Sequence, residues 1–438
     1  MTDLYKNTGL PLYSPATHLL RFCSMPVSYK RSITKKKEEA RAYPRKGFIT
    51  PSVPFAERWF IRMKKALLVT HVSGFVPQFE MGNVKILQNM GYEVHYASNY
   101  HNPSYGDDNR RLDGTGIIRH QVDFERSPYS LKNVTAYRQL KQLMEEERFD
   151  LVHCHNPMSG VIARLAAHAT NTKPVIYTAH GFHFYAGAPL KNWLFYYPVE
   201  FALSFYTDQQ ICINLEDFQR AQNYFHAKKI NYIPGVGIDV KKIRNVQINW
   251  CEKRKSLGIS DQAVVLVSAG ELIPRKNHET VIRALKDLDE RFVYVICGHG
   301  ELDAYLKKIA RDMQVENRVL FLGYRTDVLE IYKASDICVF PSFQEGLPVA
   351  LMEAMAAGLP VICSDIRGNT DLIDNNGGIL IKPAETKAYV NAVLKLDSDA
   401  GLREMMGEHN WKKAEEFDVE KVRNAMAKIY KDVLENNG

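Results

Sequence analysis

The chain has 438 residues, enough for two or three domains, and its 45% hydrophobic content is that of a globular protein with large cores. It contains no run of 18 uninterrupted apolar residues and no secretory signal pattern, which argues against a membrane-spanning or exported protein. The net charge of +7 comes from residues 1–62, which hold twelve Lys+Arg against four Asp+Glu, so the remaining 376 residues carry −1 and nucleic acid is not expected as a partner.

The first 62 residues differ from the rest of the chain. They lack sustained hydrophobic periodicity and contain the charge cluster SITKKKEEARAYPRK, whereas MKKALLVTHVSGF begins at Met63 with an apolar strand. We therefore expect residues 1–62 to be a poorly ordered basic extension and Met63 to be the natural start, so that the extension is not native. The alternatives are a basic arm on a membrane surface and a genuine small appendage.

Residues 63–238 alternate between short apolar strands and helices. The predicted strands are ALLVTHV, YEVHYASN, GIIRHQVDF, DLVHCHN, PVIYTAHG, QQICIN and INYIPG, with helical runs such as YSLKNVTAYRQLKQLMEEERF and SGVIARLAAHAT between them. Continuous apolar strands that alternate with helices are typical of a parallel sheet covered on both faces. This part of the chain is therefore predicted to be an N-terminal Rossmann-like domain.

The pattern starts again in residues 239–416. Here the predicted strands are VVLVSAGE, FVYVICGHG, VLFLGY, ICVFPS, PVICSD and GILIKP, and two long helices, GLREMMGEHNWKKAEEF and EKVRNAMAKIYKDVLEN, close the chain. Two such series predict an α/β protein of two doubly wound domains, joined by a hinge near residues 238–245. We expect the last helix, in residues 417–438, to pack back on the N-terminal domain.

Seven cysteines are scattered through the chain without a Cys-x-x-Cys pair. They are Cys23, Cys154, Cys212, Cys251, Cys297, Cys338 and Cys363. An odd, scattered set that lies mostly in apolar runs indicates reduced, buried thiols in a cytosolic protein.

Glycines and cations follow four strands of the second domain. The motifs are GELIPRKNHE with Gly270, Arg275 and Lys276, CGHGE with Gly298, GYRTDV with Arg325, and PSFQEGLP with Gly346. Ligands of open parallel sheets bind beyond the carboxyl ends of the strands, in the cleft when two domains face each other. Each motif alone is more often a turn or a solvated charge. Four together predict a site where backbone and paired cations hold a diphosphate.

Two carboxylates stand eight positions apart in PSFQEGLPVALMEAMAAG, residues 341–358. Pro348 suits the first position of a helix and Gly358 the residue just past its end, which predicts a helix over residues 349–357. Glu345 then lies in the loop before the helix, and Glu353 lies inside it among small apolar side chains. Such a carboxylate is costly without a partner. At this point a solvent-facing or ion-paired structural glutamate and a ligand-binding one both stay open.

This stretch resembles the E-x7-E motif of the retaining nucleotide-sugar glycosyltransferases of family 4, which have the two-domain GT-B fold. The motif is Glu345-GLPVALM-Glu353, preceded by PSFQ and followed by AMAAGLPVICSD, and the resemblance covers residues 63–432. The segments TAHGFHFYAGAPLKNWLFYYPVEFALSFYTD and DLVHCHNPMSGVIARLAA are similar to the branch that builds exopolysaccharides and capsules. The resemblance implies two Rossmann-like domains facing each other across a cleft, the second binding the donor and the first the acceptor.

The resemblance also assigns roles to the donor side. Glu345 would contact hydroxyls of the donor sugar, and Glu353 the hydroxyls of the nucleotide ribose. Arg275 and Lys276 would hold the donor diphosphate and stabilise charge on the leaving nucleotide, so that neither a metal nor another cofactor is expected. The other donor-binding residues implied are Gly270, Gly298, Arg325, Gly346 and Leu347, the last two through their backbone N–H groups.

His180, at the end of PVIYTAHG, matches the active-site histidine of the family. Judged by residue type alone, His180 would more often be a structural histidine of the core. Its position at the end of a strand favours a place in the ligand-binding cleft instead. Gly74 and Gly181 would line the acceptor side with it. The absence of a Cys partner or an HExxH pattern argues against a metal site. In this family a donor phosphate oxygen is thought to act as the base, so we assign no side chain as nucleophile.

The chain departs from the family pattern in two places. The first strand–helix loop, HVSGFVPQFEMG, has single glycines where many members carry a pair, which leaves phosphate contact from this loop open, and Asp371 stands where a glutamate is commoner. Two Asp-x-Asp triplets, Asp287–Asp289 and Asp397–Asp399, fall late in or between helical runs. We interpret both as surface features and not as the metal site of the other common glycosyltransferase fold.

The run NWLFYYPVEFALSFY, residues 192–206, is rich in aromatic side chains. It could rest on a membrane, which would suit a lipid-linked acceptor, or form a helix buried in the first domain, since Pro198 and Glu200 interrupt it.

The function implied is that of a cytosolic enzyme, peripheral on the inner face of the membrane. It would transfer a hexose or hexosamine from a nucleotide-diphosphate sugar, with uracil as the favoured base, to a glycan linked to polyprenyl diphosphate, with retention of configuration.

Two alternative functions stay open. A non-catalytic partner subunit would be expected to lose Arg275, Lys276, His180 or Glu345, and all are present. A nucleotide-sugar 2-epimerase needs several acid/base side chains around the sugar, and the E-x7-E pattern argues against it.

Overall fold

The computed structural model describes residues 62–104 and 109–435 of the chain. The prediction that residues 1–62 form a poorly ordered extension falls outside the described residues except for Arg62, and the proposed start at Met63 stays a prediction. From Arg62 onward the described residues belong to one compact unit.

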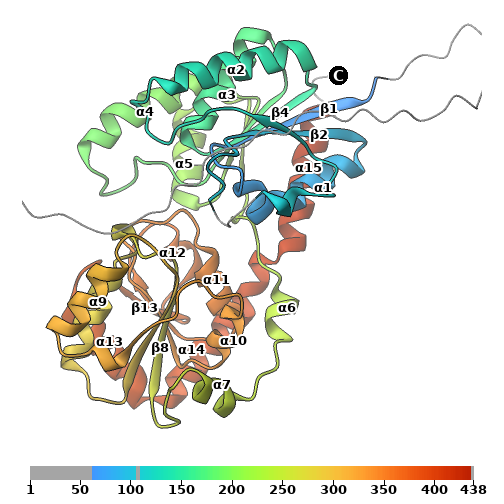
Figure 1. Ribbon diagram of the computed structural model, residues 1–438. Helices are drawn as coiled ribbons and strands as arrows, with labels where there is room; N and C mark the ends of the chain where they lie inside the picture. Colours follow the sequence, from blue (N-terminus) through green and yellow to red (C-terminus); the bar gives the residue numbers. More distant parts are fainter. Residues whose placement is uncertain (1–61, 105–108, 436–438) are drawn as a thin grey trace, which may run out of the picture. The chain divides into compact units, whose positions relative to one another are not determined.

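Seven parallel strands form the first sheet (Figure 1). They are β1 (Lys64–Val69), β2 (Tyr92–Ser98), β3 (Ile118–Gln121), β4 (Leu151–His155), β5 (Val175–Ala179), β6 (Gln209–Cys212) and β7 (Lys229–Tyr232). Their spatial order is β3-β2-β1-β4-β5-β6-β7, so the winding direction reverses between β1 and β4. The carboxyl ends of strands at such a reversal are where ligands of doubly wound sheets bind.

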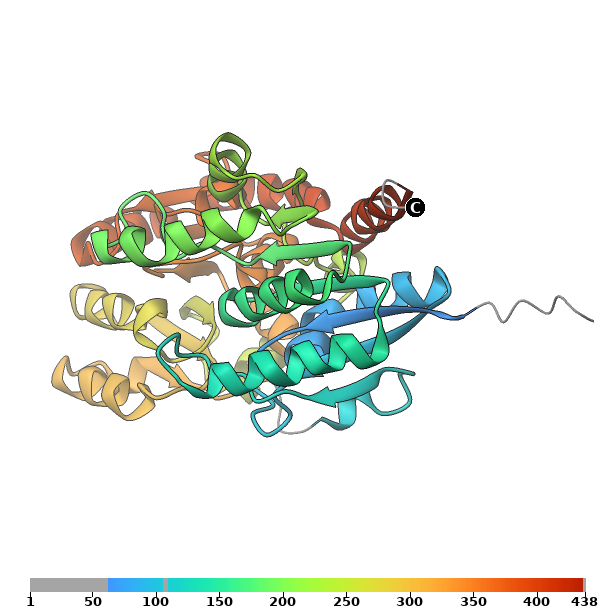
Figure 2. The same cartoon turned by 90° about the horizontal axis from the view of Figure 1, so that it is seen from above.

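Helices cover both faces of the first sheet. They are the π-helix η1 (Val76–Glu80), α1 (Met81–Asn89), the 3₁₀ turn η2 (Arg110–Leu112), α2 (Lys132–Glu147), α3 (Pro157–Thr170), α4 (Leu190–Ser204) and α5 (Leu215–Tyr224). Along β1, Leu67 and Val69 enter one buried cluster while Ala66 and Leu68 enter another, because successive side chains of a strand point to opposite faces. Helices α2, α3 and α4 lie side by side (Figure 2).

Six parallel strands form the second sheet. They are β8 (Val264–Ala269), β9 (Phe292–Cys297), β10 (Val319–Phe321), β11 (Ile337–Phe340), β12 (Val361–Ser364) and β13 (Gly378–Ile381), in the order β10-β9-β8-β11-β12-β13. The winding direction reverses between β8 and β11. All thirteen predicted strands are thus present among the described residues, and the prediction of two doubly wound α/β domains is confirmed.

Helices and short 3₁₀ turns surround the second sheet. They are α6 (Val240–Arg244), α7 (Trp250–Ser256), η3 (Pro274–Lys276), α8 (His278–Ala284), η4 (Leu285–Asp287), α9 (Asp303–Asp312), η5 (Glu316–Arg318), α10 (Val328–Lys333), α11 (Val349–Ala356), α12 (Asn369–Leu372), α13 (Thr386–Ser398), α14 (Ala400–Lys413), η6 (Ala414–Phe417) and α15 (Val419–Glu435). Helix α8 contacts α9 and α13, while α11 contacts α10 and α14. Helices α8, α9 and α13 share one buried cluster, to which α14 adds Met406, and α10 and α11 belong to another.

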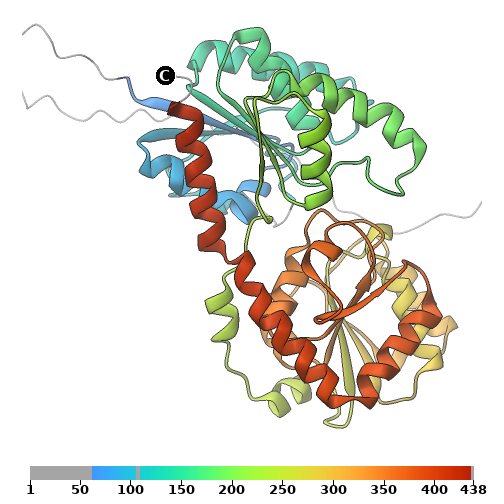
Figure 3. The same cartoon turned by 180° about the vertical axis from the view of Figure 1, so that it is seen from behind.

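The chain passes between the two sheets twice, and the two passages are hydrogen-bonded to each other. The N–H of Ile238 donates to the carbonyl of Phe417 at 2.9 Å, and the N–H of Val419 donates to the carbonyl of Ile238 at 2.8 Å. Gly237 has a φ of +74°, and a Cβ there would lie 2.7 Å from the Cα of Val419, which explains why this position is a glycine. Beyond this point α15 contacts α1 and adds side chains such as Tyr430 to the first domain's core (Figure 3).

Two sequence predictions on local structure can be compared directly with the elements observed. Helix α11 spans Val349–Ala356, and Pro348 is its N-cap with extended backbone, so the prediction that Pro348 opens the helix was wrong by one residue. Gly358 follows the helix with a φ of +86°, as its place predicted. Neither Asp-x-Asp triplet lies at the carboxyl end of a strand; Asp289 pairs with the exposed Arg291 and Asp399 caps α14, as expected of surface residues.

Candidate active site

Glu345 lies in the loop between β11 and α11 and is buried, with 7% of its surface exposed. Its Oε1 is 2.8 Å from Lys276 Nζ and its Oε2 is 2.9 Å from Arg275 Nη1. Both cations come from η3, in the loop after β8, and the pairing of β8 with β11 brings the two loops together. The loop glutamate and the cationic pair of the sequence prediction therefore form one cluster.

The charges of this cluster hold one another in their ionised forms. Burial alone would raise the pKa of Glu345, but the ammonium of Lys276 and the guanidinium of Arg275 outweigh it and lower that pKa. The Lys276 ammonium also lies 4.8 Å from the centre of the Phe340 ring, and a Cβ at Gly270 would lie 3.2 Å from Lys276 Cε. Two cations against one carboxylate leave a net positive charge, which suits an anionic ligand.

Free backbone donors surround the start of α11. The N–H groups of Gly346, Leu347, Val349 and Ala350 donate to no acceptor within the part of the chain that the structure describes. Such groups, together with the positive end of the helix dipole, bind phosphates and carboxylates. The loop thus offers an anion both fixed N–H groups and the two cations of η3.

Glu353 lies one turn further along α11 and is partly buried. Neither a hydrogen bond nor an ion pair reaches its carboxylate from any residue that the structure describes. Burial raises its pKa to about 7, and the more distant charge of Lys242 lowers it only in part. An arginine-paired structural glutamate is therefore disfavoured among the described residues, and the partly exposed carboxylate remains available to a ligand.

We expect Glu353→Gln to stabilise the unliganded protein at high pH. The folded-state pKa of about 7 lies above the ordinary 4.5, so the stability due to the protonated form is complete below pH 4.5 and is lost as the pH rises through 7. At pH 8 the variant should gain about 1–3 kcal/mol in free energy of unfolding, and much less at pH 4.5. Urea unfolding at both pH values measures this, with the exposed Glu301→Gln as control; an unchanged or lower stability at pH 8 would contradict it.

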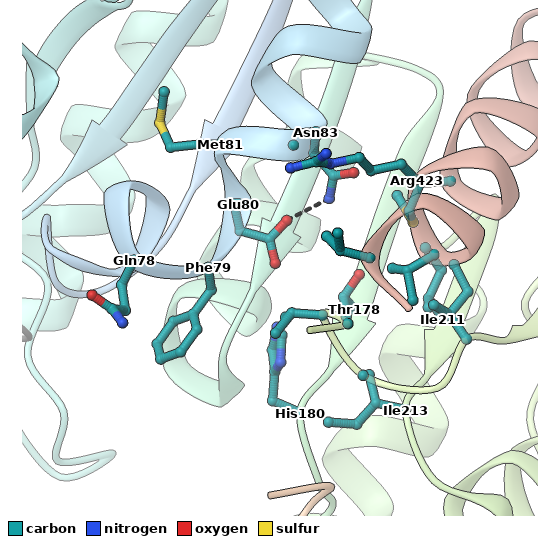
Figure 4. A pocket seen from close by; sticks show the side chains of 18 residues that line it. Gln78, Phe79, Glu80, Met81, Asn83, Thr178, His180, Ile211, Ile213 and Arg423 are labelled. Atoms are coloured by element: carbon teal, nitrogen blue, oxygen red, sulfur yellow. Dashed lines mark hydrogen bonds between the residues drawn. The ribbon is translucent and has the colours of Figure 1, made fainter. Parts of the chain in front are cut away.

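His180 follows β5, and its imidazole is aimed into a cavity of about 210 Å³ (Figure 4). Its Nε2 is 3.2 Å from His155 Nδ1, and the Phe75 ring meets it edge-on at 5.0 Å between centroids. Burial lowers the pKa of His180 to about 4, so the ring is neutral at physiological pH. Among the residues described, no hydrogen bond or ion pair joins the ring to Glu345.

Glu80 completes a cluster with the two histidines. Its Oε1 is 3.6 Å from His155 Nδ1, and one donor atom from each of Glu80, His155 and His180 lies within 4.8 Å of the others. Burial raises the pKa of Glu80 to about 8, against the hydrogen bond from Asn83 (Figure 4). Two imidazoles and a carboxylate are donors that zinc and similar metals accept. The prediction that histidines hold no metal here therefore stays a prediction.

Two glycines, Gly346 and Gly181, let the two domains meet beside this cluster, and Gly368 lets a second loop of its own domain approach Gly346. A Cβ on Gly346 would clash with the carbonyl oxygen of His180, and one on Gly368 would clash with the carbonyl oxygen of Gly346. Gly181 has a φ of +121°, and a Cβ there would lie 3.2 Å from the Cα of Gly346. The structure thus brings together the backbone of His180 and Gly181 and the loop of Glu345 and Gly346.

Sequence reasoning missed Arg367 and Asp217. The Arg367 guanidinium is buried between the two domains and lies 2.8 Å from Asp217 Oδ1 across the interface. Arg367 stands in RGNTDLI just after β12, so the rule that picked out Arg275 at a strand end could have found it. In the same segment, Asp371 Oδ2 accepts a 2.9 Å hydrogen bond from the N–H of Leu215.

Other predicted residues lie apart from the glutamate cluster or have a local reason for their identity. The N–H of Gly74 donates to the carbonyl of Pro103 at 2.6 Å. This glycine therefore lies where two chain segments pass close to each other, and its N–H already has an acceptor. A Cβ on Gly298 would clash with the carbonyl oxygen of Gly270, so these two serve a close approach of two loops. Arg325 forms a two-point ion pair with Asp327 at 2.7 and 2.6 Å and makes no contact with Glu345 among the described residues.

Two family models match the chain, one on each domain. Residues 64–214 match "Glycosyl transferase 4-like" and residues 251–413 match "Glycosyl transferases group 1". The chain is also 35% identical over 377 residues to the putative glycosyltransferase EpsD of Bacillus subtilis, a match that covers 84% of this chain and 96% of EpsD. The chain belongs to this glycosyltransferase family. It is therefore a glycosyltransferase, as the E-x7-E resemblance predicted.

A second relative of this glycosyltransferase is named for its substrates. The chain is 32% identical to the Escherichia coli UDP-Gal:alpha-D-GlcNAc-diphosphoundecaprenol alpha-1,3-galactosyltransferase, over 70% of this chain and 81% of that enzyme. Among solved structures, Anabaena Alr3699/HepE in complex with UDP superposes with a TM-score of 0.69 at 20% identity, over 84% of this chain and all of HepE. That likeness confirms the GT-B fold.

No helix in the described part of the glycosyltransferase has the length and apolar character needed to span a membrane.

Proposed function

We propose that the enzyme transfers a hexose or hexosamine from a UDP-linked donor to a glycan acceptor linked to polyprenyl diphosphate, with retention of configuration and without a metal. The observation that carries the proposal is the cluster of Glu345, Lys276 and Arg275 beside the free N–H groups of Gly346 and Leu347. It offers cations and backbone donors to a diphosphate and a carboxylate to sugar hydroxyls in one place.

In the unliganded enzyme the two cations are already neutralised in part by Glu345. A donor diphosphate would share these cations, and the carboxylate would then be free to accept hydrogen bonds from the sugar. Glu353, which has no polar contact among the described residues, would accept hydrogen bonds from the ribose hydroxyls. Each carboxylate thus gains a partner when the donor binds.

The transfer step is a substitution at the anomeric carbon of the donor. The bond from that carbon to the diphosphate oxygen breaks, and its electron pair stays on the diphosphate, where Lys276 and Arg275 stabilise the new charge. The acceptor hydroxyl oxygen bonds to the same face of the sugar, and its proton passes to the departing diphosphate oxygen. The products are a nucleoside diphosphate and a glycoside of unchanged configuration.

The acceptor class is supported by the diphosphoundecaprenol substrate named for the Escherichia coli relative and by an apolar surface on the first domain. Helix α4 packs Trp193, Tyr197 and Phe201 toward the core, so the predicted burial of this run holds for one side. Its other side exposes apolar residues, as do the start of α2 and the adjoining α3: Leu190, Leu194, Phe195, Val199, Tyr129, Leu131, Val134 and Leu165. We define this set as the apolar surface and place it on the cytoplasmic face of a membrane.

We expect the double variant Leu194→Ser/Phe195→Ser to bind anionic phospholipid vesicles about 10-fold more weakly, or worse, because both side chains are more than 60% exposed and would be buried in lipid. Vesicle co-sedimentation of the full chain measures this. Met405→Ser, which removes an exposed apolar side chain of the second domain, is the control. Equal binding of the double variant and the native chain would contradict the membrane contact.

A thermal-shift panel of UDP, GDP, ADP and their sugar conjugates tests the donor assignment. A ligand that binds only the folded state raises the melting temperature by an amount set by its affinity. We expect a shift with the uridine series that is lost in Lys276→Ala and Glu353→Ala. A higher melting temperature with guanosine or adenosine nucleotides would change the assignment of the donor base. No change with any nucleotide would favour a non-catalytic partner subunit.

A further inference from the structure

Arg367 is buried at the meeting point of the two domains. It follows β12, has 8% of its surface exposed, and faces Asp217 on α5, which is fully buried. An arginine and an aspartate buried together cost desolvation energy unless their hydrogen bonds are well satisfied, so the full set of contacts decides what the pair does.

On the side of the first domain, Arg367 contacts the segment that follows β5. Its Nη1 donates to Asp217 Oδ1 at 2.8 Å and to the carbonyl of Phe182 at 3.0 Å. Its guanidinium carbon lies 4.7 Å from the centre of the Tyr185 ring. Asp217 in turn accepts from the N–H of Phe182 at 2.9 Å. This segment begins at His180, the histidine of the site.

On the side of the second domain, Arg367 contacts the loop of Glu345. Its Nε and Nη2 both donate to the carbonyl of Glu345, at 3.2 and 3.1 Å. The side chain of Glu345 is held by Lys276 and Arg275, and its main chain is held by Arg367. One rigid guanidinium therefore joins the first domain to the main chain of the glutamate proposed to contact the donor sugar.

We propose that Arg367 is a positioning residue that fixes the Glu345 loop only while the first domain, through Asp217, is docked against it. The inference rests on the proposed function, in which Glu345 contacts the donor sugar. Domain contact and sugar placement are then coupled: without Asp217 the guanidinium loses its anchor, and the carbonyl of Glu345 loses the donors that hold it. Binding of the nucleotide, at Glu353 and the cations of η3, does not depend on this contact.

A lysine cannot replace this function. Arginine presents five N–H groups in a flat fork, and four hydrogen bonds of Arg367 leave in two directions, toward Asp217 and Phe182 and toward Glu345. A lysine ammonium at the same position would keep an ion pair with Asp217 but would not span both sets of acceptors. Arg367→Lys therefore separates the charge of the residue from its bridging geometry.

The first test measures donor turnover by the full chain with Arg367→Lys and Asp217→Asn. Misplacing the sugar loop by about 1 Å should lower kcat on the order of 100-fold, with little change in the dissociation constant for UDP. Arg291→Lys, which alters an exposed ion pair of the second domain, is the control. Folded variants with kcat within about 3-fold of native, or with UDP affinity lost in step with kcat, would overturn the inference.

A second readout does not depend on turnover. Hydrogen–deuterium exchange of the unliganded chain is read on peptides covering residues 342–353, where the N–H groups of Phe343, Leu351 and Met352 on either side of the Glu345 loop are hydrogen-bonded. These amides should exchange faster in Asp217→Asn than in the native chain, although the substitution lies in the other domain, because the loop opens more often without its anchor. Unchanged exchange would overturn the coupling. If the native chain turned over no nucleotide sugar while this exchange still rose, the proposed function would fail and the coupling would stand.

Discussion

Lys276→Met lowers kcat for glycosyl transfer on the order of 100- to 1,000-fold, the cost of removing one preorganised charge that stabilises a leaving group. The ammonium lies 2.8 Å from Glu345 and is 12% exposed, so its field at the diphosphate is little screened by water. Methionine keeps the apolar stem over Phe340 and Gly270 and removes the charge. The substitution should therefore lower kcat much more than it lowers the stability of the folded protein.

The measurement is initial-rate kinetics with a UDP-sugar donor, with thermal unfolding of the same samples. Lys286→Met, an exposed lysine beyond α8, is the matched control and should leave kcat unchanged. A folded Lys276→Met variant with kcat within about 5-fold of native would contradict the role given to the cation.

Arg164→Met lowers the free energy of unfolding by about 3–5 kcal/mol, the expected cost of removing one partner of a buried ion pair. Arg164 on α3 is completely buried, and its Nη2 lies 2.8 Å from Glu200 Oε2 on α4. Its guanidinium also lies 3.9 Å from the centre of the Tyr177 ring, whose hydroxyl donates to Glu200 at 3.1 Å. Without the arginine, the Glu200 carboxylate is left buried with only the tyrosine hydroxyl.

Urea denaturation measures this loss as a lower free energy of unfolding in the transition of the first domain. The double variant Arg164→Met/Glu200→Gln removes the stranded carboxylate as well, so it should lose less than the sum of the two single variants. A loss below about 1 kcal/mol in Arg164→Met, or strict additivity in the double variant, would contradict the account of the pair.

The alternation of apolar strands and helices predicted the fold because it depends on short-range patterns. Strands such as VVLVSA and DLVHCH are buried on both faces, so their composition marks them without knowledge of their neighbours. The position of Glu345 in a loop and of Glu353 inside a helix followed in the same way from Pro348 and Gly358. Local chemistry was sufficient for these features.

Contacts between distant segments could not be predicted in this way. The pairing of Glu345 with Lys276 and Arg275 depends on β8 and β11 being neighbours, and the bridge from Asp217 to Arg367 joins residues 150 positions apart. The contact of the His180 ring with His155 and with the Phe75 ring likewise depends on packing between distant segments. No spacing rule within a single motif carries that information.

The central claim is tested most directly by incubating the full chain with radiolabelled UDP-sugars and a saccharide linked to undecaprenyl diphosphate, in buffer with EDTA. The account predicts a longer lipid-linked glycan and an equal amount of UDP, with the new linkage in the donor's own anomeric configuration. Release of UDP without glycan extension, an inverted linkage, or complete loss of transfer in EDTA would contradict it.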